Sequence, residues 1–279
     1  MPSSTPLISI ITPSFNQGKY LEHTIQSVLN QDYPNLEYII IDGGSTDNSV
    51  EIIKKYESQL TYWVSEPDRG QTHALNKGFS KAKGDITAWL NSDDFYEDNC
   101  LKRVSSIFNK SPDTDIICGH SRTLNSDGSR GVILKTRQPH LYPLIHHARL
   151  MKNEIPTVIP HQPSVFMRKK VMNTVGKLDE SLHYSMDYDL WLHCIERRFR
   201  FEVLDEVLSN YLFHDSSKSN QGWDAFMEEW TLVSRQHKDK FSTWKKLQIE
   251  AWWIWTRYVK YGFKIAEREL RKTMKNGSC

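Results

Sequence analysis

Apolar runs of β-strand type alternate with helix-like stretches through the first part of the chain. Residues 7–12, 36–41 and 85–90 form the apolar runs, while residues 20–31 and 46–56 have the character of helices. A repeated order of strand, loop and helix is typical of a parallel sheet with helices on its faces. We therefore expect an α/β fold with a Rossmann-like, mostly parallel central sheet flanked by helices.

Each of these apolar runs ends in a polar cluster. The clusters occupy residues 13–16 (Pro-Ser-Phe-Asn), 42–47 (Asp-Gly-Gly-Ser-Thr-Asp) and 91–94 (Asn-Ser-Asp-Asp). In open α/β sheets ligands bind outside the carboxyl ends of the strands, and a hard divalent cation there needs only one or two carboxylates beside phosphate and water. The pattern predicts a metal and phosphate site, although the same residue types also form ordinary solvated turns.

Length and composition are those of an ordinary globular protein. The 279 residues suffice for one large domain, or for one domain and an appendage, and the net charge of +2 with no basic tract in the N-terminal half argues against a nucleic-acid partner. Cys100, Cys118, Cys194 and Cys279 have neither zinc-site nor disulfide-framework spacing, so we expect reduced, structural thiols. Without a signal segment or an apolar span of ~20 residues, a cytoplasmic location is expected.

From Trp223 onward the periodicity is helical, and aromatic residues alternate with basic ones. The aromatic residues are Trp244, Trp252, Trp253, Trp255 and Tyr258, and the basic residues are Lys245, Lys246, Arg257, Lys260, Lys264, Arg268, Arg271 and Lys272. This composition suits a helix lying on an anionic membrane surface. It equally suits tryptophans that pack onto the rest of the chain or onto a second subunit. We expect residues 222–279 to form a helical extension with one of these contacts.

The polar motifs also occur in a fixed order along the chain. The order is Pro13–Asn16, Asp42–Asp47, Asp68–Gly70, Ala74–Gly78, Gly84–Asp85, Asn91–Asp94, His161–Ser164, Gly176–Glu180, Met186–Trp191 and Tyr211–His214. This order resembles the family 2 glycosyltransferases, inverting nucleotide-sugar transferases with a GT-A fold. The resemblance implies one GT-A domain over residues 1–221, with a nucleotide-binding half (1–110) and an acceptor and catalytic-base half (111–221).

The resemblance assigns a donor site and a metal. The donor residues it implies are Pro13, Ser14, Asn16, Asp42, Asp68, Arg69, Asn76, Asn91, Ser92, Asp93, His214 and Lys218. Asp42 would accept a hydrogen bond from the base, which favours a UDP-sugar. The residues alone suggest that Asp42 and Asp47 form the turn, with Thr46 or Asp47 capping the next helix, and both roles could hold at once. Asp93, Asp94 and His214 would hold Mn²⁺ or Mg²⁺, and Asn91, where many relatives carry Asp, would contact the ribose.

The second group of motifs supplies the reaction's base. Asp187 corresponds to the family's catalytic base, at the start of a predicted helix over residues 188–198, whereas the residues alone suggest only a helix cap. Met186 stands where relatives often carry Glu. His161, Gln162 and Asp189 would lie on the acceptor side. His73, His146 and His147 are assigned no role and are expected on the surface or in loops.

Together these inferences predict a metal-dependent inverting transferase of the hexosyl or N-acetylhexosaminyl class. Its acceptor would be a hydroxyl of a sugar or of a polyprenyl-linked glycan in cell-envelope or surface-polysaccharide synthesis, with peripheral contact to the inner face of the membrane, or a homo-oligomer, through the C-terminal helices. A dinucleotide-dependent oxidoreductase would carry Gly-x-Gly-x-x-Gly in residues 12–19, which is missing. A non-catalytic nucleotide-binding protein would need no base at Asp187. The donor sugar cannot be read from these motifs.

Overall fold

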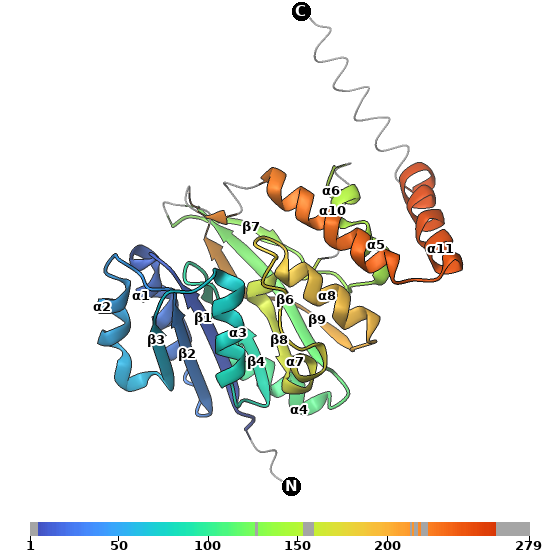
Figure 1. Ribbon diagram of the computed structural model, residues 1–279. Helices are drawn as coiled ribbons and strands as arrows, with labels where there is room; N and C mark the ends of the chain where they lie inside the picture. The colour runs from blue at the N-terminus through green and yellow to red at the C-terminus, as the bar shows by residue number, and fades with distance from the viewer. Residues whose placement is uncertain are drawn as a thin grey trace, which may run out of the picture.

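A nine-stranded sheet with helices on both faces forms the centre of the protein (Figure 1). The computed structural model describes residues 5–125, 128–152, 159–212, 214, 217–218 and 223–260, and side chains through residue 258. The elements of the N-terminal part are β1 (Ile8–Ser14), α1 (Gly18–Leu29), β2 (Leu36–Asp42), α2 (Ser49–Lys55), η1 (Glu57–Gln59), β3 (Tyr62–Ser65), α3 (Gln71–Lys81) and β4 (Ile86–Trp89). The strands and helices predicted here are confirmed.

The second part adds antiparallel strands and the helices that cover the site. Its elements are β5 (Phe95–Tyr96), α4 (Cys100–Lys110), β6 (Ile116–Leu124), β7 (Arg130–Leu134), α5 (Leu141–Ile145), α6 (His147–Lys152), η2 (Gln162–Ser164), β8 (Val165–Arg168), α7 (Lys169–Val175), α8 (Met186–Glu196), β9 (Phe201–Leu212), α10 (Trp223–Asp239), α11 (Thr243–Ile254) and η3 (Trp255–Lys260).

The strand order places the predicted polar loops along one edge of the sheet. The order is β3-β2-β1-β4-β8-β6-β9-β5, with β7 paired to β6, and β1 runs parallel to both β2 and β4. Ser14 pairs in register with Asp42, and Ile11 with Trp89, so the loops that follow β1, β2 and β4 begin side by side. The parallel register therefore gathers residues 13–16, 42–47 and 91–94 at one edge.

Successive residues of the central strands face two separate apolar cores, as expected for strands covered on both faces. Ile11, Ile39 and Trp89 pack with residues of α3 and α8, whereas Ile10 and Ile40 pack with residues of α1 and α4. Trp89 stacks on Trp191 of α8, with ring centroids 6.1 Å apart, which fixes α8 against the end of β4. The helix that carries the predicted base is thus anchored beside the predicted metal loop.

Cys100, Cys118 and Cys194 are buried free thiols, as predicted, and Cys279 lies outside the described residues. The expectation that His146 and His147 lie on the surface or in loops is wrong: they end α5 and begin α6, and both rings are buried. The His146 ring lies 6.0 Å from the Trp252 ring and 5.5 Å from the Trp253 ring of α11. Burial of these histidines depends on helices about a hundred residues later in the chain.

The C-terminal helices pack one face on the domain and expose the other. α10 contacts α5, α6 and α8, and α11 contacts α5. Ile249 is fully buried and Trp252 and Trp253 are partly covered, so some of the tryptophans do pack onto the chain itself. Lys264, Arg268, Arg271 and Lys272 lie outside the described residues. Within the described part of the chain, we find no helix long and apolar enough to cross a bilayer.

Candidate active site

A cleft of about 980 Å³ opens at the carboxyl ends of β1 and β4, between this sheet edge and the N-terminal ends of α8 and α10. Most of the predicted site residues line it: Pro13, Ser14, Asp68, Arg69, Asn91, Ser92, Asp93, His161, Gln162, Asp187 and Lys218. Asn16, Asp42, Asn76, Asp94, Asp189 and His214 do not appear among its lining residues. The predicted donor, metal and acceptor segments therefore meet in one cavity, and the six residues outside its lining have other surroundings.

Asp42 shapes the loop after β2 and does not face the cleft. Its fully buried carboxylate accepts hydrogen bonds from the backbone N–H groups of Gly44 (3.1 Å) and Ser45 (2.9 Å) and from the Ser65 hydroxyl (2.7 Å). Gly44 has φ of +82°, a conformation that favours glycine. The turn-forming role therefore describes Asp42 in this structure, and the expected contact of Asp42 with a base stays a prediction.

Asp68 lies where a base contact is possible. Its carboxylate approaches Gly43, since a Cβ built on Gly43 would lie 2.8 Å from Asp68 Oδ2, and both residues line the cleft. Asn16 instead joins the loops: its Oδ1 accepts from the Thr46 N–H (2.8 Å), and its own N–H donates to the Ser45 hydroxyl (2.8 Å). The side chain of Asn16 holds the loops that frame the donor end.

The side chain of Asn76 joins two segments of the domain. Its Nδ2 donates to the Leu178 carbonyl (2.9 Å), and its Oδ1 accepts from the Leu178 N–H (2.9 Å), both in the buried interior. These bonds tie α3 to the loop before α8. In this structure the Asn76 side chain therefore supports the segment that leads to Asp187, and its contact with the donor stays a prediction.

Asp93 and Asp94 have different surroundings. Asp93 faces the cleft, and its Oδ2 lies 2.9 Å from His214 Nε2, because the end of β9 pairs beside β5 and so brings residue 214 next to residue 93. Asp94 is fully buried, and its Oδ2 accepts from Asn91 Nδ2 (3.1 Å). Burial, with the nearby charge of Asp93, holds the pKa of Asp94 well above its ordinary value. Asp94 is therefore not placed as a metal ligand beside Asp93 and His214.

Asp93 and His214 fit a divalent cation. A carboxylate oxygen and an imidazole nitrogen in contact, at the mouth of a cleft, are ligands that Mn²⁺ accepts, with phosphate and water completing the shell. Asn91 belongs to the floor of the cleft: its Oδ1 accepts from Gln71 Nε2 (2.7 Å), and its Nδ2 reaches Gln162 Oε1 (3.2 Å). The predicted ribose contact for Asn91 would thus compete with these bonds.

Asp187 occupies the first turn of α8 and lines the cleft. Burial raises its pKa to about 6, against the opposing hydrogen bond from the Tyr188 backbone N–H, which lies 2.7 Å from Oδ1. Met186, beneath it, is buried. A carboxylate with a pKa nearer neutrality accepts a proton more readily than an ordinary one and is still ionised at pH 7. Asp187 therefore has the environment of a general base, which helix capping alone would not require.

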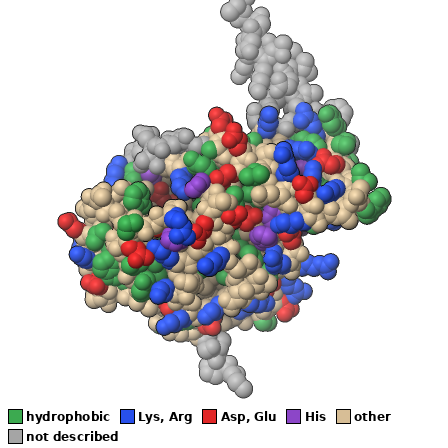
Figure 2. Space-filling view, in the orientation of Figure 1, with side chains coloured by type: hydrophobic (Ala, Val, Ile, Leu, Met, Phe, Trp, Pro, Cys, Tyr) green, Lys and Arg blue, Asp and Glu red, His purple; other side chains and the backbone are tan. Residues whose placement is uncertain are grey.

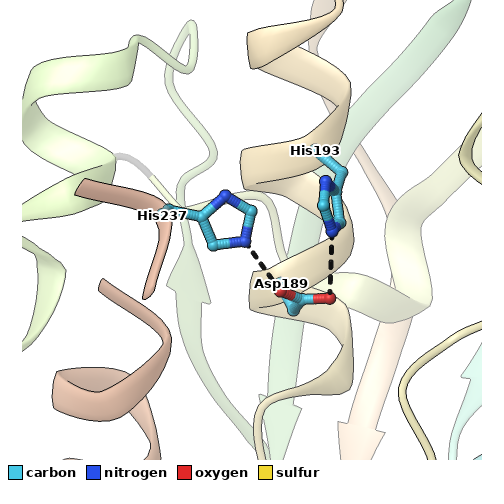
Figure 3. A group of neighbouring side chains, drawn as sticks. All are labelled: Asp189, His193 and His237. Atoms are coloured by element: carbon cyan, nitrogen blue, oxygen red, sulfur yellow. Dashed lines mark hydrogen bonds and ion pairs between the residues drawn. The ribbon is translucent and has the colours of Figure 1, made fainter. Parts of the chain in front are cut away.

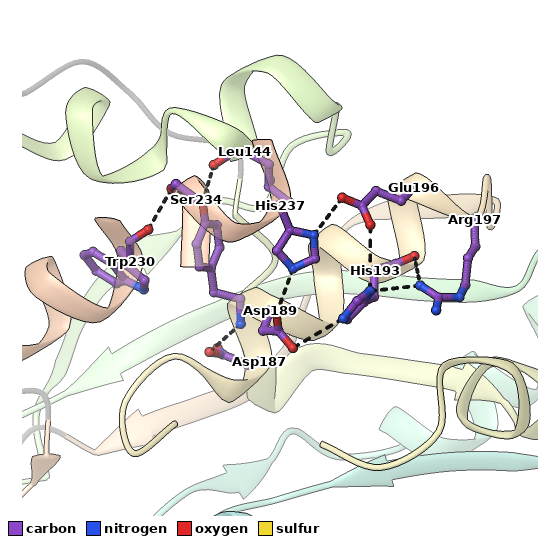
Figure 4. Close-up of polar contacts among 10 residues, drawn as sticks. Leu144, Asp187, Asp189, His193, Glu196, Arg197, Trp230, Ser234 and His237 are labelled. Atoms are coloured by element: carbon purple, nitrogen blue, oxygen red, sulfur yellow. Dashed lines mark hydrogen bonds and ion pairs between the residues drawn. The ribbon is translucent and has the colours of Figure 1, made fainter. Parts of the chain in front are cut away.

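Helix α10 holds the segment on both sides of Asp187. Before Asp187, the Glu229 carboxylate accepts from the backbone N–H groups of His183 (2.9 Å), Tyr184 (2.8 Å) and Ser185 (3.0 Å). After it, the Tyr188 hydroxyl lies 2.8 Å from the Ser234 hydroxyl and donates to the Leu144 carbonyl (Figure 4). These bonds fix the path of the chain into α8.

Asp189 faces α10 and not the acceptor side of the cleft (Figure 3). His237 Nε2 lies 2.7 Å from Asp189 Oδ1, and His237 Nδ1 lies 2.6 Å from Glu196 Oε1. Burial alone would lower the pKa of His237, but the hydrogen bonds and charges of Asp189 and Glu196 outweigh burial and raise it. The acceptor-side prediction for Asp189 is therefore not supported, because this carboxylate joins α8 to α10.

Asp189, His193 and His237 are, among the residues that the structure describes, the one convergent set of three metal-type ligands. His193 Nε2 lies 3.7 Å from Asp189 Oδ2. The distances from His237 to its carboxylates are hydrogen-bond distances, and Arg197, which can only donate, lies 2.8 Å from His193 Nδ1 (Figure 4). His193 Nε2 thus carries the hydrogen in a neutral ring, so the cluster is a hydrogen-bonded joint between α8 and α10.

The Glu229 contacts predict a loss of stability when the carboxylate is removed. Glu229→Gln is expected to lower the free energy of unfolding by about 1–3 kcal/mol, because an amide offers one acceptor where the carboxylate accepts several charge-assisted bonds. The matched control is Glu228→Gln, at an exposed position with no such contacts in the described chain. Urea unfolding of both variants measures the difference, and equal midpoints would show that the joint contributes nothing.

Several residues of the cleft carry no sequence motif. Gln71 accepts from Lys218 Nζ (2.9 Å), which also donates to the His183 carbonyl (3.0 Å). Burial lowers the pKa of Lys218, while the charges of Glu229 and Asp93 oppose this shift. His147, Tyr184, Trp223, Phe226 and Trp230 complete the wall. Gln71, Glu229 and His147 could not be found by spacing, because their partners are distant in sequence.

Comparison with known proteins identifies relatives over most of the chain. The family model described as "Glycosyl transferase family 2" matches residues 9–176. An uncharacterised glycosyltransferase of Rickettsia typhi is 31% identical over 244 residues, covering 82% of this chain and 71% of the relative. A putative teichuronic acid biosynthesis glycosyltransferase, TuaG of Bacillus subtilis, is 26% identical over 264 residues, covering 93% of this chain and 97% of the relative.

Solved structures share the fold. TarS residues 1–349 from S. aureus, in complex with UDP-GlcNAc, gives a TM-score of 0.67 at 18% identity and covers 90% of this chain and 72% of that one. The mannosyltransferase PcManGT from Pyrobaculum calidifontis, in complex with GDP-Man and Mn²⁺, gives 0.62 at 15% identity and covers 100% of this chain and 78% of that one. At these identities the likeness concerns the fold alone, and it confirms the expected GT-A architecture.

Proposed function

The chain belongs to glycosyl transferase family 2, and from that premise we propose that it is a metal-dependent, inverting enzyme. The group transferred is a hexosyl or N-acetylhexosaminyl residue of a UDP-sugar, and the acceptor is a hydroxyl of a sugar or polyprenyl-linked glycan in cell-envelope polysaccharide synthesis. The UDP-GlcNAc bound to TarS and the putative role of TuaG in teichuronic acid biosynthesis support this choice. Family membership removes the oxidoreductase alternative.

One observation carries the proposal: Asp93 and Asp187 line the same cleft in different environments. Asp93 touches His214 at the sheet edge, whereas Asp187 stands apart at the start of α8 with its pKa raised to about 6. Two carboxylates in such different surroundings are suited to separate tasks. Asp93 faces the donor and Asp187 faces the acceptor.

In the proposed reaction Asp187 accepts the proton of the acceptor hydroxyl. The hydroxyl oxygen forms a bond to the anomeric carbon while the bond from that carbon to the diphosphate oxygen breaks on the opposite face, so the configuration inverts. The electron pair of the broken bond leaves on the nucleoside diphosphate, and the proton remains on Asp187 until solvent takes it. A divalent cation held by Asp93 and His214 would supply Lewis-acid neutralisation of the diphosphate.

The remaining donor contacts follow from the cleft lining. Asp68, whose side chain lines the cleft, would accept a hydrogen bond from a ring N–H of uracil. Lys218 bonds to Gln71 and to the His183 carbonyl, and its ammonium group would bind the diphosphate of the donor. Pro13 and Ser14 at the end of β1 would contact the nucleoside.

A panel of nucleotide sugars and nucleoside diphosphates tests the proposal directly. The purified chain is incubated with each compound in Mn²⁺ or in EDTA, and thermal stabilisation and release of nucleoside diphosphate are measured. We expect stabilisation by UDP compounds and slow UDP release, both lost in EDTA. Binding without turnover of any donor would favour the non-catalytic alternative, and no response to any nucleotide would contradict a transferase.

We also propose that α11 rests on an anionic lipid surface. Trp244, Leu247 and Ile254 of α11 and Trp255 and Tyr258 of η3 are exposed at helical spacing on the face opposite Ile249, and the same segment carries the basic residues Lys245, Lys246 and Arg257. Figure 2 shows hydrophobic and basic side chains adjoining at the end of the molecule that carries α11. Exposed aromatic residues with flanking cations are typical of helices at the lipid headgroup level.

Vesicle flotation measures this contact. Trp244→Ser combined with Leu247→Ser is expected to weaken binding to vesicles of phosphatidylglycerol and phosphatidylcholine by about 10-fold, because apolar burial and lipid electrostatics both contribute to such contacts. Val132→Ser, which changes an exposed apolar side chain on β7, is the control. If the wild-type chain does not bind the vesicles and instead dimerises through α11, then a second subunit covers this face and the lipid contact is contradicted.

A further inference from the structure

The end of the cleft beside Asp187 is walled by aromatic rings. Tyr184, from the loop before α8, lies 4.8 Å from the Phe226 ring, which lies 5.5 Å from the Trp230 ring. Trp223 stands perpendicular to Trp230 at 5.9 Å and remains half exposed. All four line the cleft, and three belong to α10. Rings set at different angles leave flat faces and edges turned toward the cavity.

His147 adds a polar group to this wall. Its ring lies 4.4 Å from the Trp230 ring, it lines the cleft, and its buried Nε2 has no hydrogen-bond partner. Burial lowers the pKa of His147 to about 3, so the ring is neutral in the physiological range. A buried polar atom without a partner costs free energy, which a ligand hydroxyl in the cleft would recover.

Among the described residues that line the cleft, Arg69 and Lys218 are the only Lys or Arg side chains. Arg69 pairs with Glu180, and Lys218 is bonded to Gln71 and to the carbonyl of His183, so both cations already have partners. His161 also lines the cleft, and burial lowers its pKa to about 4. The side chain of Asp187 accepts from the Tyr188 N–H and has no cationic partner among the described residues.

We propose that this aromatic wall is the acceptor subsite and that it selects an uncharged pyranose; the inference rests on the proposed role of Asp187. A pyranose presents a face of C–H groups that packs on an aromatic ring, and its hydroxyls can bond to His147 Nε2. A uronate or a phosphorylated sugar would bring a second negative charge beside Asp187 without a compensating cation, which costs affinity. The acceptor's terminal residue is a neutral sugar, free or lipid-linked.

Saturation-transfer NMR on the full chain with UDP and Mn²⁺ tests this. The probes are the methyl glycosides of glucose, galactose, N-acetylglucosamine and glucuronic acid. We expect at least one neutral glycoside to bind and the glucuronide to bind at least 5-fold more weakly. Equal or tighter binding of the glucuronide, or no binding of any neutral probe, overturns the proposal. Thermal stabilisation of the same protein preparation by UDP shows whether the donor site itself is intact.

Variants locate the binding. Trp223→Ala changes a half-exposed ring and should fold normally, and His147→Phe removes the free Nε2 while keeping a ring. Each is expected to weaken binding of the neutral glycoside about 10-fold with unchanged stabilisation by UDP, whereas Trp244→Ala on α11 changes neither. Unaltered glycoside binding in both cleft variants would place the acceptor elsewhere.

A competition experiment distinguishes a lipid-linked acceptor from a free sugar. A neutral lipid-linked glycan is added to the sample that contains the methyl glycoside. Displacement of the methyl glycoside indicates that the acceptor is lipid-linked, and lack of displacement indicates that the acceptor is a free sugar.

Discussion

Replacing Asp187 by Asn is expected to reduce transfer by about 10²–10⁴-fold, the usual contribution of a general base. The amide keeps the shape and the cleft, so stabilisation by UDP should not change. The control is Asp113→Asn, at a solvent-exposed carboxylate that pairs with Arg200 on the surface. An Asp187→Asn enzyme that retains transfer would remove this residue as the base, whatever the donor.

The same role sets a pH dependence. Because burial raises the pKa of Asp187 to about 6, activity should fall as the pH drops through about 6, where the carboxylate takes up its proton and can no longer accept one from the acceptor. This acidic limb should be missing from the residual activity of Asp187→Asn. An unchanged limb in the variant would assign it to another group.

Replacing Asp93 by Asn is expected to lower donor turnover by at least about 10²-fold, since Lewis-acid stabilisation of a leaving group is worth several kcal/mol. Stabilisation by UDP should shrink and lose its sensitivity to EDTA, which is a readout independent of turnover. Asp98→Asn, at an exposed neighbouring position, serves as control.

Asp94→Asn provides the sharper contrast. The buried Asp94 bonds to Asn91, and its raised pKa favours the neutral acid, which an amide resembles. We therefore expect a much smaller effect than at Asp93. Equal losses in the two variants would mean that both carboxylates hold the cation, contrary to the geometry described.

The sheet could be predicted because its first strands contain apolar runs. β1 and β2 are buried along nearly their whole length, their isoleucines contribute to both apolar cores, and each strand is followed by a polar loop. The position of Asp93 followed from that rule. The different surroundings of Asp93 and Asp94 did not, because the two residues lie in a turn, closed by the bond from the Asp94 N–H to the Asn91 carbonyl, whose geometry the pattern does not give.

Asp187 and Asp189 illustrate what a motif leaves undecided. Residues two apart on an α-helix point about 200° apart, so once Asp187 faces the cleft, Asp189 must face elsewhere. The helix was predicted, but its rotation is fixed by Trp191 against Trp89 and by α10. Glu229 has no local signature at all, because its partners are backbone N–H groups more than forty residues earlier.

The C-terminal tryptophans divide between the two alternatives that the sequence left open. Trp252 and Trp253 pack against His146, whereas Trp244 is 70% exposed. Aromatic and basic composition could not separate an inner from an outer face, because both faces of α11 are apolar. Only the position of α5 determines which side is covered.

The most direct test of the central claim is the configuration of the sugar released by donor hydrolysis, followed by ¹H NMR before mutarotation. In this reaction water replaces the acceptor hydroxyl, so no acceptor need be known. An α-linked UDP-sugar is expected to yield the β-anomer first, as a single displacement assisted by Asp187 requires. First appearance of the α-anomer would show retention of configuration and contradict the account.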